Sequence, residues 1–199
     1  MNELKMLRTR DVGDLALRAA DLFRDRAVAA GLVDVFFATI DSPVGELLIA
    51  GTRRGLVRVS FLNEDLDDLV EELATLLSPR ILEAPAQLDE VRRELDEYFG
   101  GERDRFELPL DMSLTRGFTR KVLRVTSRIP FGSVSTYKDV ARRAGNDRAY
   151  RAAGNALGAN PIPIVVPCHR VLHADGGLGG YGGGLDVKRF LLHLEHAID

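Results

Sequence analysis

The feature that most constrains the fold is a change of hydrophobic pattern across residues 100–112. This segment opens with two glycines and contains Pro109 among charged side chains, a composition that ends helices and strands. Strand-like and helical patterns alternate before it, whereas helical patterns dominate after it. We therefore expect two domains, at residues 34–108 and 109–199, preceded by a helical extension at residues 1–33.

The first half predicts a small antiparallel sheet with helices, an α+β unit. A turn signal, Asp41-Ser42-Pro43, separates the first two strand-like runs, which is typical of a meander. A helix is expected at residues 11–30, before Gly31, and packing against the acidic first domain is its default role. The predicted strands are residues 35–40, 47–50 and 56–61, and the predicted helices are residues 65–77 and 88–99.

The second half predicts short helices joined by turns. Two of them flank the three-residue turn Gly145-Asn146-Asp147, which is the helix-turn-helix pattern, although many helical hairpins never touch DNA. An extended, proline-rich stretch is expected at residues 160–167 and a glycine-crowded loop at residues 176–184. The predicted helices are residues 118–128, 137–144, 148–157 and 186–197.

The formal net charge of -3 hides an asymmetry between the halves. Residues 1–108 carry 14 Lys and Arg against 23 Asp and Glu, whereas residues 109–199 carry 13 against 7. This division favours a second half that faces a polyanion such as nucleic acid. An uneven surface without any partner is equally compatible with the charge alone.

Composition narrows the classes further. No run of about 18 apolar residues occurs and the N-terminus is charged, so we expect no membrane partner, no secretory signal and a cytoplasmic location. The single cysteine, Cys168, cannot form an internal disulfide and is left free for chemistry. All four histidines follow it, so the first half has no soft-metal cluster. We expect no metal and no cofactor.

Cys168 is followed directly by His169. A thiol attacks carbon usefully only as a thiolate and needs a base, and the base needs an acceptor such as Glu195 to orient it. Neighbouring side chains on an extended strand point to opposite faces, so a turn or a bridging water is required to bring the two together. The alternative is a buried, inert Cys168 and a solvated Glu195.

The blocks around Cys168 resemble a known family, the O6-alkylguanine-DNA alkyltransferases, also called methylated-DNA–protein-cysteine methyltransferases. The central block is Pro167-Cys168-His169-Arg170-Val171, preceded by Asn160-Pro161-Ile162-Pro163. The resemblance covers residues 34–197. The flanking blocks in register are Ile129-Pro130-Phe131-Gly132, Ser135-Thr136-Tyr137, Arg151-Ala152-Ala153-Gly154 and Gly183-Gly184-Leu185 with Lys188.

The resemblance implies a ribonuclease H-like first domain and a winged-helix-like second domain that carries the helix-turn-helix and the active-site cysteine. It implies direct-reversal DNA repair: irreversible transfer of an alkyl group, chiefly methyl, from O6-alkylguanine, and also O4-alkylthymine, in duplex DNA to the protein's own cysteine. The damaged nucleotide would be flipped out from the minor-groove side, because a base within the duplex cannot reach a protein thiol. The protein would act once, as a monomer on double-stranded DNA.

The resemblance also implies catalytic roles. Cys168 would be the alkyl acceptor, His169 the base acting through a water, and Glu195 the group that orients the imidazole. Asn160 would brace the active-site turn by hydrogen bonding. Tyr137 would donate a hydrogen bond or proton to the departing purine.

Further residues would contact DNA or the flipped base. Arg151 would insert into the base stack to fill the vacancy left by the nucleotide. Val171, Tyr181 and Gly182 would form the substrate pocket. The other implied DNA-binding residues are Thr136, Tyr137, Ala152 and Gly154.

The chain departs from the family at Gly182, where many relatives carry Ser. The run at residues 179–184 is nearly all glycine, so we expect a mobile pocket wall and weaker discrimination against bulky alkyl groups. A phosphate-binding loop is not indicated, because no Gly-Lys-Ser/Thr follows.

Three other classes of protein fit the sequence less well. Binding-only relatives lack the cysteine, so Cys168 argues against that class. A transcriptional regulator would need long polar side chains on the second helix of the pair, and few are present. A cysteine hydrolase would need an oxyanion hole, for which the sequence gives no sign.

Overall fold

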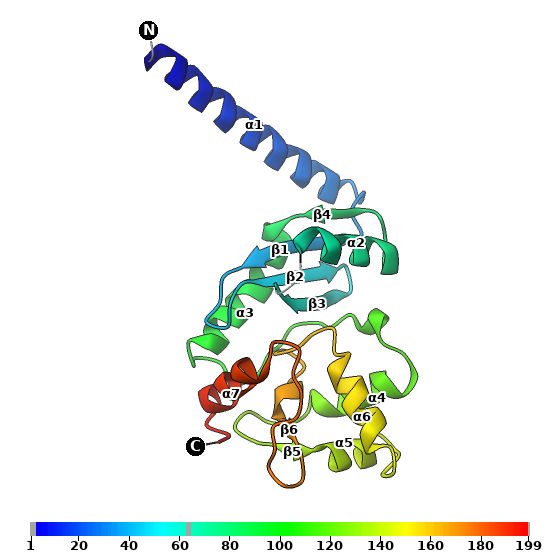
Figure 1. Cartoon of the computed structure of the whole chain (residues 1–199). Helices are drawn as coiled ribbons and strands as arrows, with labels where there is room; N and C mark the ends of the chain where they lie inside the picture. The colour runs from blue at the N-terminus through cyan, green and yellow to red at the C-terminus, as the bar shows by residue number, and fades with distance from the viewer. Residues whose placement is uncertain (1–2, 63–64, 199) are drawn as a thin grey trace.

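The computed structural model describes the backbone of residues 3–62 and 65–198, and side chains over residues 15–16, 18–62 and 65–198. Two regions follow one another along the chain (Figure 1). The first contains a sheet covered by helices, and the second is built mainly of short helices. This is the mixed α+β architecture that the sequence predicts.

The sheet of the first region has the strand order β3-β2-β1-β4. The three predicted strands are confirmed as the antiparallel meander β1 (Val35–Ile40), β2 (Leu47–Thr52) and β3 (Gly55–Phe61). A fourth strand, β4 (Ile81–Glu83), was not predicted and lies parallel to β1. Its three residues are too few for a period-two pattern to be visible.

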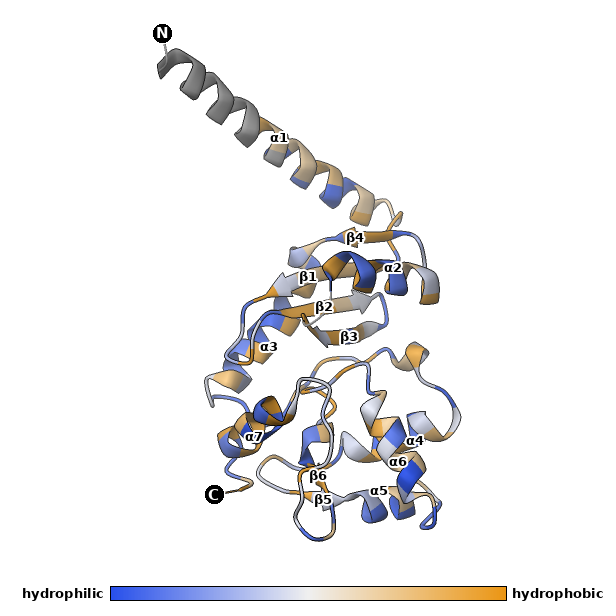
Figure 2. Ribbon diagram, in the orientation of Figure 1, coloured by the Kyte–Doolittle hydropathy of each residue, from blue (hydrophilic) through white to orange (hydrophobic). Residues whose placement is uncertain are grey.

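Each face of the sheet packs against a different helix. The helix α2 (Leu66–Leu76) buries Leu69 and Leu73 against one face, and its N-terminus is capped by the Asp65 side chain. The helix α3 (Asp89–Phe99), entered through the 3-10 turn η1 (Pro85–Leu88), covers the other face. In Figure 2 the central strand β2 is largely hydrophobic in colour, in agreement with the burial of its first five residues.

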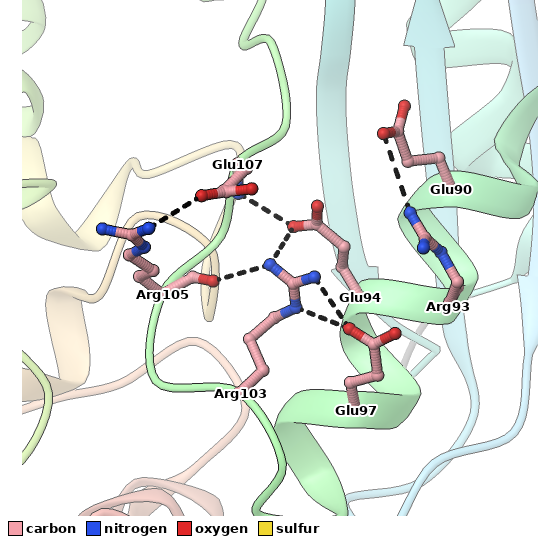
Figure 3. Close-up of polar contacts among 7 residues, drawn as sticks. All are labelled: Glu90, Arg93, Glu94, Glu97, Arg103, Arg105 and Glu107. Atoms are coloured by element: carbon pink, nitrogen blue, oxygen red, sulfur yellow. Dashed lines mark hydrogen bonds and ion pairs between the residues drawn. The ribbon is translucent and has the colours of Figure 1, made fainter.

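The predicted linker is held against α3 (Figure 3). Arg103 lies 2.8 Å from a Glu97 carboxylate oxygen and 3.4 Å from one of Glu94, which is itself buried. The backbone N–H of Glu107 donates to Glu94 at 2.9 Å, and Leu110 forms an isolated bridge with β3. The segment is therefore irregular in conformation but bound to the first region at several points.

The predicted N-terminal helix is present as α1 (Glu3–Ala29). Gly31 ends it with a φ of 70°, a conformation that glycine adopts without strain, and Leu32 N–H donates to the Ala27 carbonyl. Among its described side chains, Ala27 near the C-terminal end is buried in the core, whereas Leu15 and Phe23 are 70% and 66% exposed. The helix extends away from the sheet (Figure 1), so the expected packing against the first domain is found, among its described side chains, near its C-terminal end.

The second region contains the predicted helix-turn-helix. The pair is α5 (Tyr137–Arg143) and α6 (Tyr150–Gly158), both packed on α4 (Gly117–Thr126). Thr136 caps α5 by accepting the Asp139 N–H. The remaining elements are η2 (Met112–Leu114), the parallel pair β5 (Ser135–Thr136) and β6 (Val171–Leu172), η3 (Cys168–Arg170), and α7 (Leu185–Leu194).

Residues 160–167 are not extended, which corrects the sequence prediction. Val166 N–H donates to the Ile162 carbonyl and Val165 N–H to that of Pro163, so the chain turns before it reaches Cys168. The fully buried Ile164 has a φ of 72°, a strained conformation for a β-branched residue. The prolines that suggested an extended strand are instead part of a tight, internally bonded turn.

A continuous apolar core joins the two regions. Buried side chains from β2 and α3, including Ile49 and Leu95, belong to the same cluster as Ile162 and Leu191 of the second region. Among the described residues, no helix has the length and apolar character needed to cross a membrane. Because of this shared core, the first region packs against the segment that carries Cys168.

Candidate active site

Cys168 begins the 3-10 turn η3 and is only 8% exposed. Asn160 donates from Nδ2 to the Cys168 sulfur at 3.2 Å and to the Val166 carbonyl at 2.8 Å. Its Oδ1 accepts the N–H of Ile162 at 3.1 Å. One amide side chain thus ties both ends of the active-site turn to the sulfur.

The environment of Cys168 both opposes and assists ionisation. Burial raises the pKa of the thiol, while the Asn160 hydrogen bond and the positive charge of Lys188 act in the opposite direction; the net direction is upward. The resting sulfur is therefore a thiol at neutral pH. A base must remove its proton when a substrate is present.

His169 occupies the next position of the turn, and Glu195 ends α7. His169 Nε2 lies 2.8 Å from Glu195 Oε1, and both side chains are fully buried. Burial lowers the pKa of His169, so the imidazole is neutral at neutral pH, with the Nε2 proton directed at the carboxylate. Its Nδ1 has no hydrogen-bond partner among the described residues and is the nitrogen free to accept a proton.

Glu195 is the centre of a larger buried network. Arg170 donates to it from Nε at 2.7 Å and from Nη2 at 2.8 Å, and Tyr98 donates its hydroxyl at 2.6 Å. Burial alone would raise the pKa of this carboxyl, but hydrogen bonds from His169 and Arg170 lower it to about 2. The carboxylate is therefore ionised throughout the physiological pH range.

A cavity of about 550 Å³ opens beside Cys168, which is ample for a purine base. It is formed by α5, α6 and the glycine loop, so the helix-turn-helix and the nucleophile share one recess. The lining residues are Tyr137, Tyr150, Arg151, Gly154, Leu157, Gly158, Cys168, His173, Gly180, Tyr181 and Gly182.

Tyr137 lines this cavity at the start of α5. Burial, and secondly the proximity of Cys168, raises the pKa of its phenol, so the hydroxyl keeps its proton at neutral pH. Its ring lies against His173, with centroids 5.0 Å apart. A protonated phenol facing the same cavity as the sulfur is a potential proton donor.

The predicted DNA-contacting residues fall into two groups. Arg151 and Ala152 are exposed on α6, and the Arg151 guanidinium lies 5.7 Å from the Tyr150 ring centroid. Gly154 is half-buried beneath the Tyr137 ring, where an added Cβ would just reach van der Waals contact at 3.8 Å. Thr136 is engaged in capping α5.

The predicted pocket residues differ in their placement. Tyr181 and Gly182 line the cavity, and the Tyr181 ring stands edge-on to His169 with centroids 6.3 Å apart. Val171 is fully buried and lines neither of the two cavities that contain Cys168. Its carbonyl accepts a hydrogen bond from Lys188 at 2.7 Å, so the structure does not bring this side chain to the site.

The second cavity that contains Cys168, of about 780 Å³, lies between the two regions. Arg58 and Phe61 contribute to it from β3, and Asn160 and Gly182 from the second region. Cys168 therefore lines both cavities. No cluster of His, Cys, Asp and Glu suited to a metal ion occurs within the described part of the chain.

Sequence reasoning assigned no role to several residues of the site. Arg170 and Lys188 belong to the matching blocks, but their side-chain partners are visible only in the fold. Tyr98 and Phe61 lie in the first region, far from Cys168 in the sequence, and no motif marks them. His173 follows the cysteine block, and it could have been suspected only as a histidine near the nucleophile.

Comparison with known proteins agrees with this arrangement. Residues 35–112 match the family described as 6-O-methylguanine DNA methyltransferase, ribonuclease-like domain, and residues 117–197 match its DNA binding domain. A methylated-DNA–protein-cysteine methyltransferase of Methanosarcina barkeri is 38% identical over 168 residues, covering 81% of this chain and 97% of that protein. The constitutive enzyme of Bacillus subtilis is 39% identical, covering 80% and 94%.

Solved structures give the same result. Mycobacterium tuberculosis O6-methylguanine methyltransferase superimposes with a TM-score of 0.70 at 37% identity, covering 82% of this chain and 93% of that one. A structure of the Mycobacterium tuberculosis protein OGT in complex with DNA gives a TM-score of 0.70 at 36% identity, covering 81% and 93%. The chain therefore belongs to the family of methylated-DNA–protein-cysteine methyltransferases, which are DNA-repair alkyltransferases.

Proposed function

We propose that this protein repairs O6-alkylguanine, and also O4-alkylthymine, in duplex DNA by moving the alkyl group to Cys168. Each molecule acts once, because the thioether formed has no good leaving group. The protein works as a monomer and needs no cofactor. The observation that carries the proposal is the placement of Cys168 at the junction of a hydrogen-bonded relay and a purine-sized cavity.

Residues around the cavity supply and accept the protons that the reaction moves. The thiol proton passes, through a water, to His169 Nδ1, which Glu195 orients by holding Nε2. The sulfur forms a bond to the alkyl carbon as the carbon–O6 bond breaks. The electron pair of the broken bond stays on O6 of the purine. Tyr137 donates a proton to the purine and takes one back from solvent, while His169 releases to solvent the proton that it took from Cys168. The proton lost by Cys168 therefore balances the one that guanine gains.

The nucleotide must leave the duplex for this geometry to be reached. We place Arg151 in the vacancy, since it is exposed on α6 at the rim of the cavity. Ala152 and Gly154 let α6 approach a narrow groove closely, and Thr136 fixes the start of α5. Approach from the minor groove suits a protein that must examine DNA without reading sequence. Tyr181 and Gly182 would bound the O6 substituent.

The decisive experiment is to incubate the protein with duplex DNA that carries radiolabelled O6-methylguanine and to locate the label. One equivalent of label on the peptide that contains Cys168, absent in Cys168→Ser, supports the proposal. Label that stays on the DNA despite tight binding would contradict it and favour a binding-only protein. The same assay with O4-methylthymine tests the second substrate.

A second variant separates flipping from chemistry. Arg151→Ala should react normally with the free base O6-benzylguanine while it repairs duplex DNA more slowly. Equal losses on both substrates would contradict the role of Arg151. A minor-groove ligand that blocks repair, compared with a major-groove substituent that does not, tests the side of approach.

A further inference from the structure

Tyr98 connects the first region directly to the hydrogen-bonded pair of His169 and Glu195, the proposed relay. It lies near the end of α3, and its side chain is fully buried. The hydroxyl donates to Glu195 Oε1 at 2.6 Å, across 97 positions of sequence. Through this hydrogen bond the sheet domain contacts Glu195, which orients the proposed base His169.

The oxygen that Tyr98 binds is the one that binds the imidazole. Glu195 Oε1 accepts from Tyr98, from His169 Nε2 at 2.8 Å and from Arg170 Nη2 at 2.8 Å, whereas Oε2 accepts from Arg170 Nε alone among the described residues. Donors that share one carboxylate oxygen share its electron density. The strength of the bond to His169 therefore depends on whether the phenol is present.

The position of the hydroxyl is fixed from several directions. The Tyr98 ring packs against Phe99, Phe106 and Phe131, with centroid separations of 5.5, 5.1 and 6.3 Å. The end of α3 is in turn held by the Arg103 network on Glu94 and Glu97 (Figure 3). Little freedom is left to lose when the hydrogen bond forms, so the phenol is preorganised.

We propose that Tyr98 is a positioning residue for alkyl transfer. Its hydroxyl fixes the position of Glu195 Oε1 and weakens the hydrogen bond between that oxygen and His169, which keeps the imidazole neutral and oriented as a base. The proposal rests on the proposed function. Tyr98 lines neither of the two cavities described at Cys168, and it acts through Glu195 and His169. It makes the first region a participant in setting the reactivity of Cys168.

The groups around the relay define what a pH measurement would report. Tyr98, His169, Arg170 and Tyr181 face Glu195, and Glu195, Arg170, Lys188 and the Tyr181 ring face His169. Removing the Tyr98 hydroxyl changes none of their charges. The carboxylate, with one donor fewer, stabilises an imidazolium more strongly, so the pKa of His169 rises. Since only neutral His169 accepts a proton, the rate begins to fall at a higher pH.

The test is Tyr98→Phe, which keeps the ring contacts and removes only the hydroxyl. Two rates are measured against pH: single-turnover methyl transfer from duplex O6-methylguanine, and alkylation of the single cysteine by iodoacetamide. We expect the acid limb of both profiles to move upward by about 0.5 to 1 pH unit, which lowers the rates about threefold to tenfold on that limb. Profiles that superimpose on those of the unmodified protein would overturn the proposal.

Arg103→Gln is the matched control, because it loosens the end of α3 but leaves the phenol in place. It should lower thermal stability while the acid limb stays where it is. An equal shift in this variant would assign the effect to attachment of the helix and overturn the proposal. If the unmodified protein transfers no methyl group, the proposed function fails, and the iodoacetamide profile still decides whether Tyr98 tunes the sulfur.

Discussion

The two walls around Cys168 are built on opposite principles. The relay wall comprises the half-buried Asn160 and the buried residues 168–170 and Glu195, with hydrogen bonds of 2.7 to 3.2 Å among them. The glycine wall, residues 176–184, faces it across the cavity, and Gly180 and Gly182 have no atom within 4 Å of where a Cβ would stand. The sulfur's reactivity and the room for its substrate are therefore controlled by separate structures, which mutation can separate.

The glycine wall is not loose throughout. A Cβ on Gly183 would come within 2.8 Å of the Phe61 ring, and one on Gly179 would collide with the Tyr137 hydroxyl. Phe61 also stands edge-on to Tyr181, with ring centroids 5.7 Å apart. Glycine at these two positions permits close contact, whereas at positions 180 and 182 it leaves open space.

The largest expected effect comes from the centre of the relay wall. Glu195→Gln keeps the volume but leaves the buried Arg170 without a carboxylate, which should cost about 3 to 5 kcal/mol of unfolding free energy. Methyl transfer should slow by about 100-fold or more because the imidazole loses its orienting charge. Urea denaturation and single-turnover kinetics measure the two effects.

The matched control for this prediction is Glu90→Gln. Glu90 is 66% exposed, with its carboxylate 3.8 Å from Arg93, and its substitution should change stability by less than about 0.5 kcal/mol. Similar losses in the two variants would remove the distinction between a buried relay and ordinary surface charge.

The next effect is the pH dependence of that stability. Because the pKa of Glu195 falls from 4.5 to about 2 on folding, its ionised form stabilises the protein above pH 4.5, and this contribution is lost as the pH falls toward 2. The stability difference between the unmodified protein and Glu195→Gln should therefore narrow only below pH 4.5. A difference that stays constant into that acid range would contradict the assigned pKa.

A smaller effect is expected where the glycine wall meets β3. Gly183→Ala places a methyl group against the Phe61 ring and should cost about 1 to 3 kcal/mol through overpacking. Combining it with Phe61→Ala should recover part of the loss, so a double-mutant cycle by thermal unfolding would show a coupling energy. Strict additivity would mean that the ring and the loop do not meet in solution.

The smallest effect is a gain. Gly180 has no positive φ and open space around its Cα, so Gly180→Ala should raise stability by about 0.4 to 1 kcal/mol by restricting the unfolded chain. Thermal unfolding measures this. A destabilised Gly180→Ala would indicate that this part of the glycine wall is closely packed. The two walls would then differ less in packing.

The sequence predicted elements wherever a regular period was long enough. The meander at β1–β3, both helices of the sheet domain and the helix-turn-helix are confirmed. The three-residue β4 was missed because it has no period, and residues 160–167 were wrongly predicted as extended because prolines suit both strands and turns. The domain boundaries at residues 34–108 and 109–199 stay a prediction.

The site was predicted unevenly for a similar reason. Cys168, His169, Glu195 and Asn160 came from the resemblance, and the fold brings them into one network. Their catalytic roles stay predictions. Tyr98 could not be foreseen, since the contact of a residue on α3 with Glu195 depends on how two regions pack across a shared core. Val171 was expected in the pocket, yet its side chain is fully buried.

The two cavities that Cys168 lines also bear on the lifetime of the unused protein. An electrophile small enough to enter the cavity between β3 and the second region has an approach to this residue that passes the C-terminal end of α6 but not Tyr150 or Arg151. DNA seated on the helix-turn-helix would then shield the thiol on one side only. The protein, which can react only once, is thus open to inactivation by such an electrophile even while it is bound to DNA.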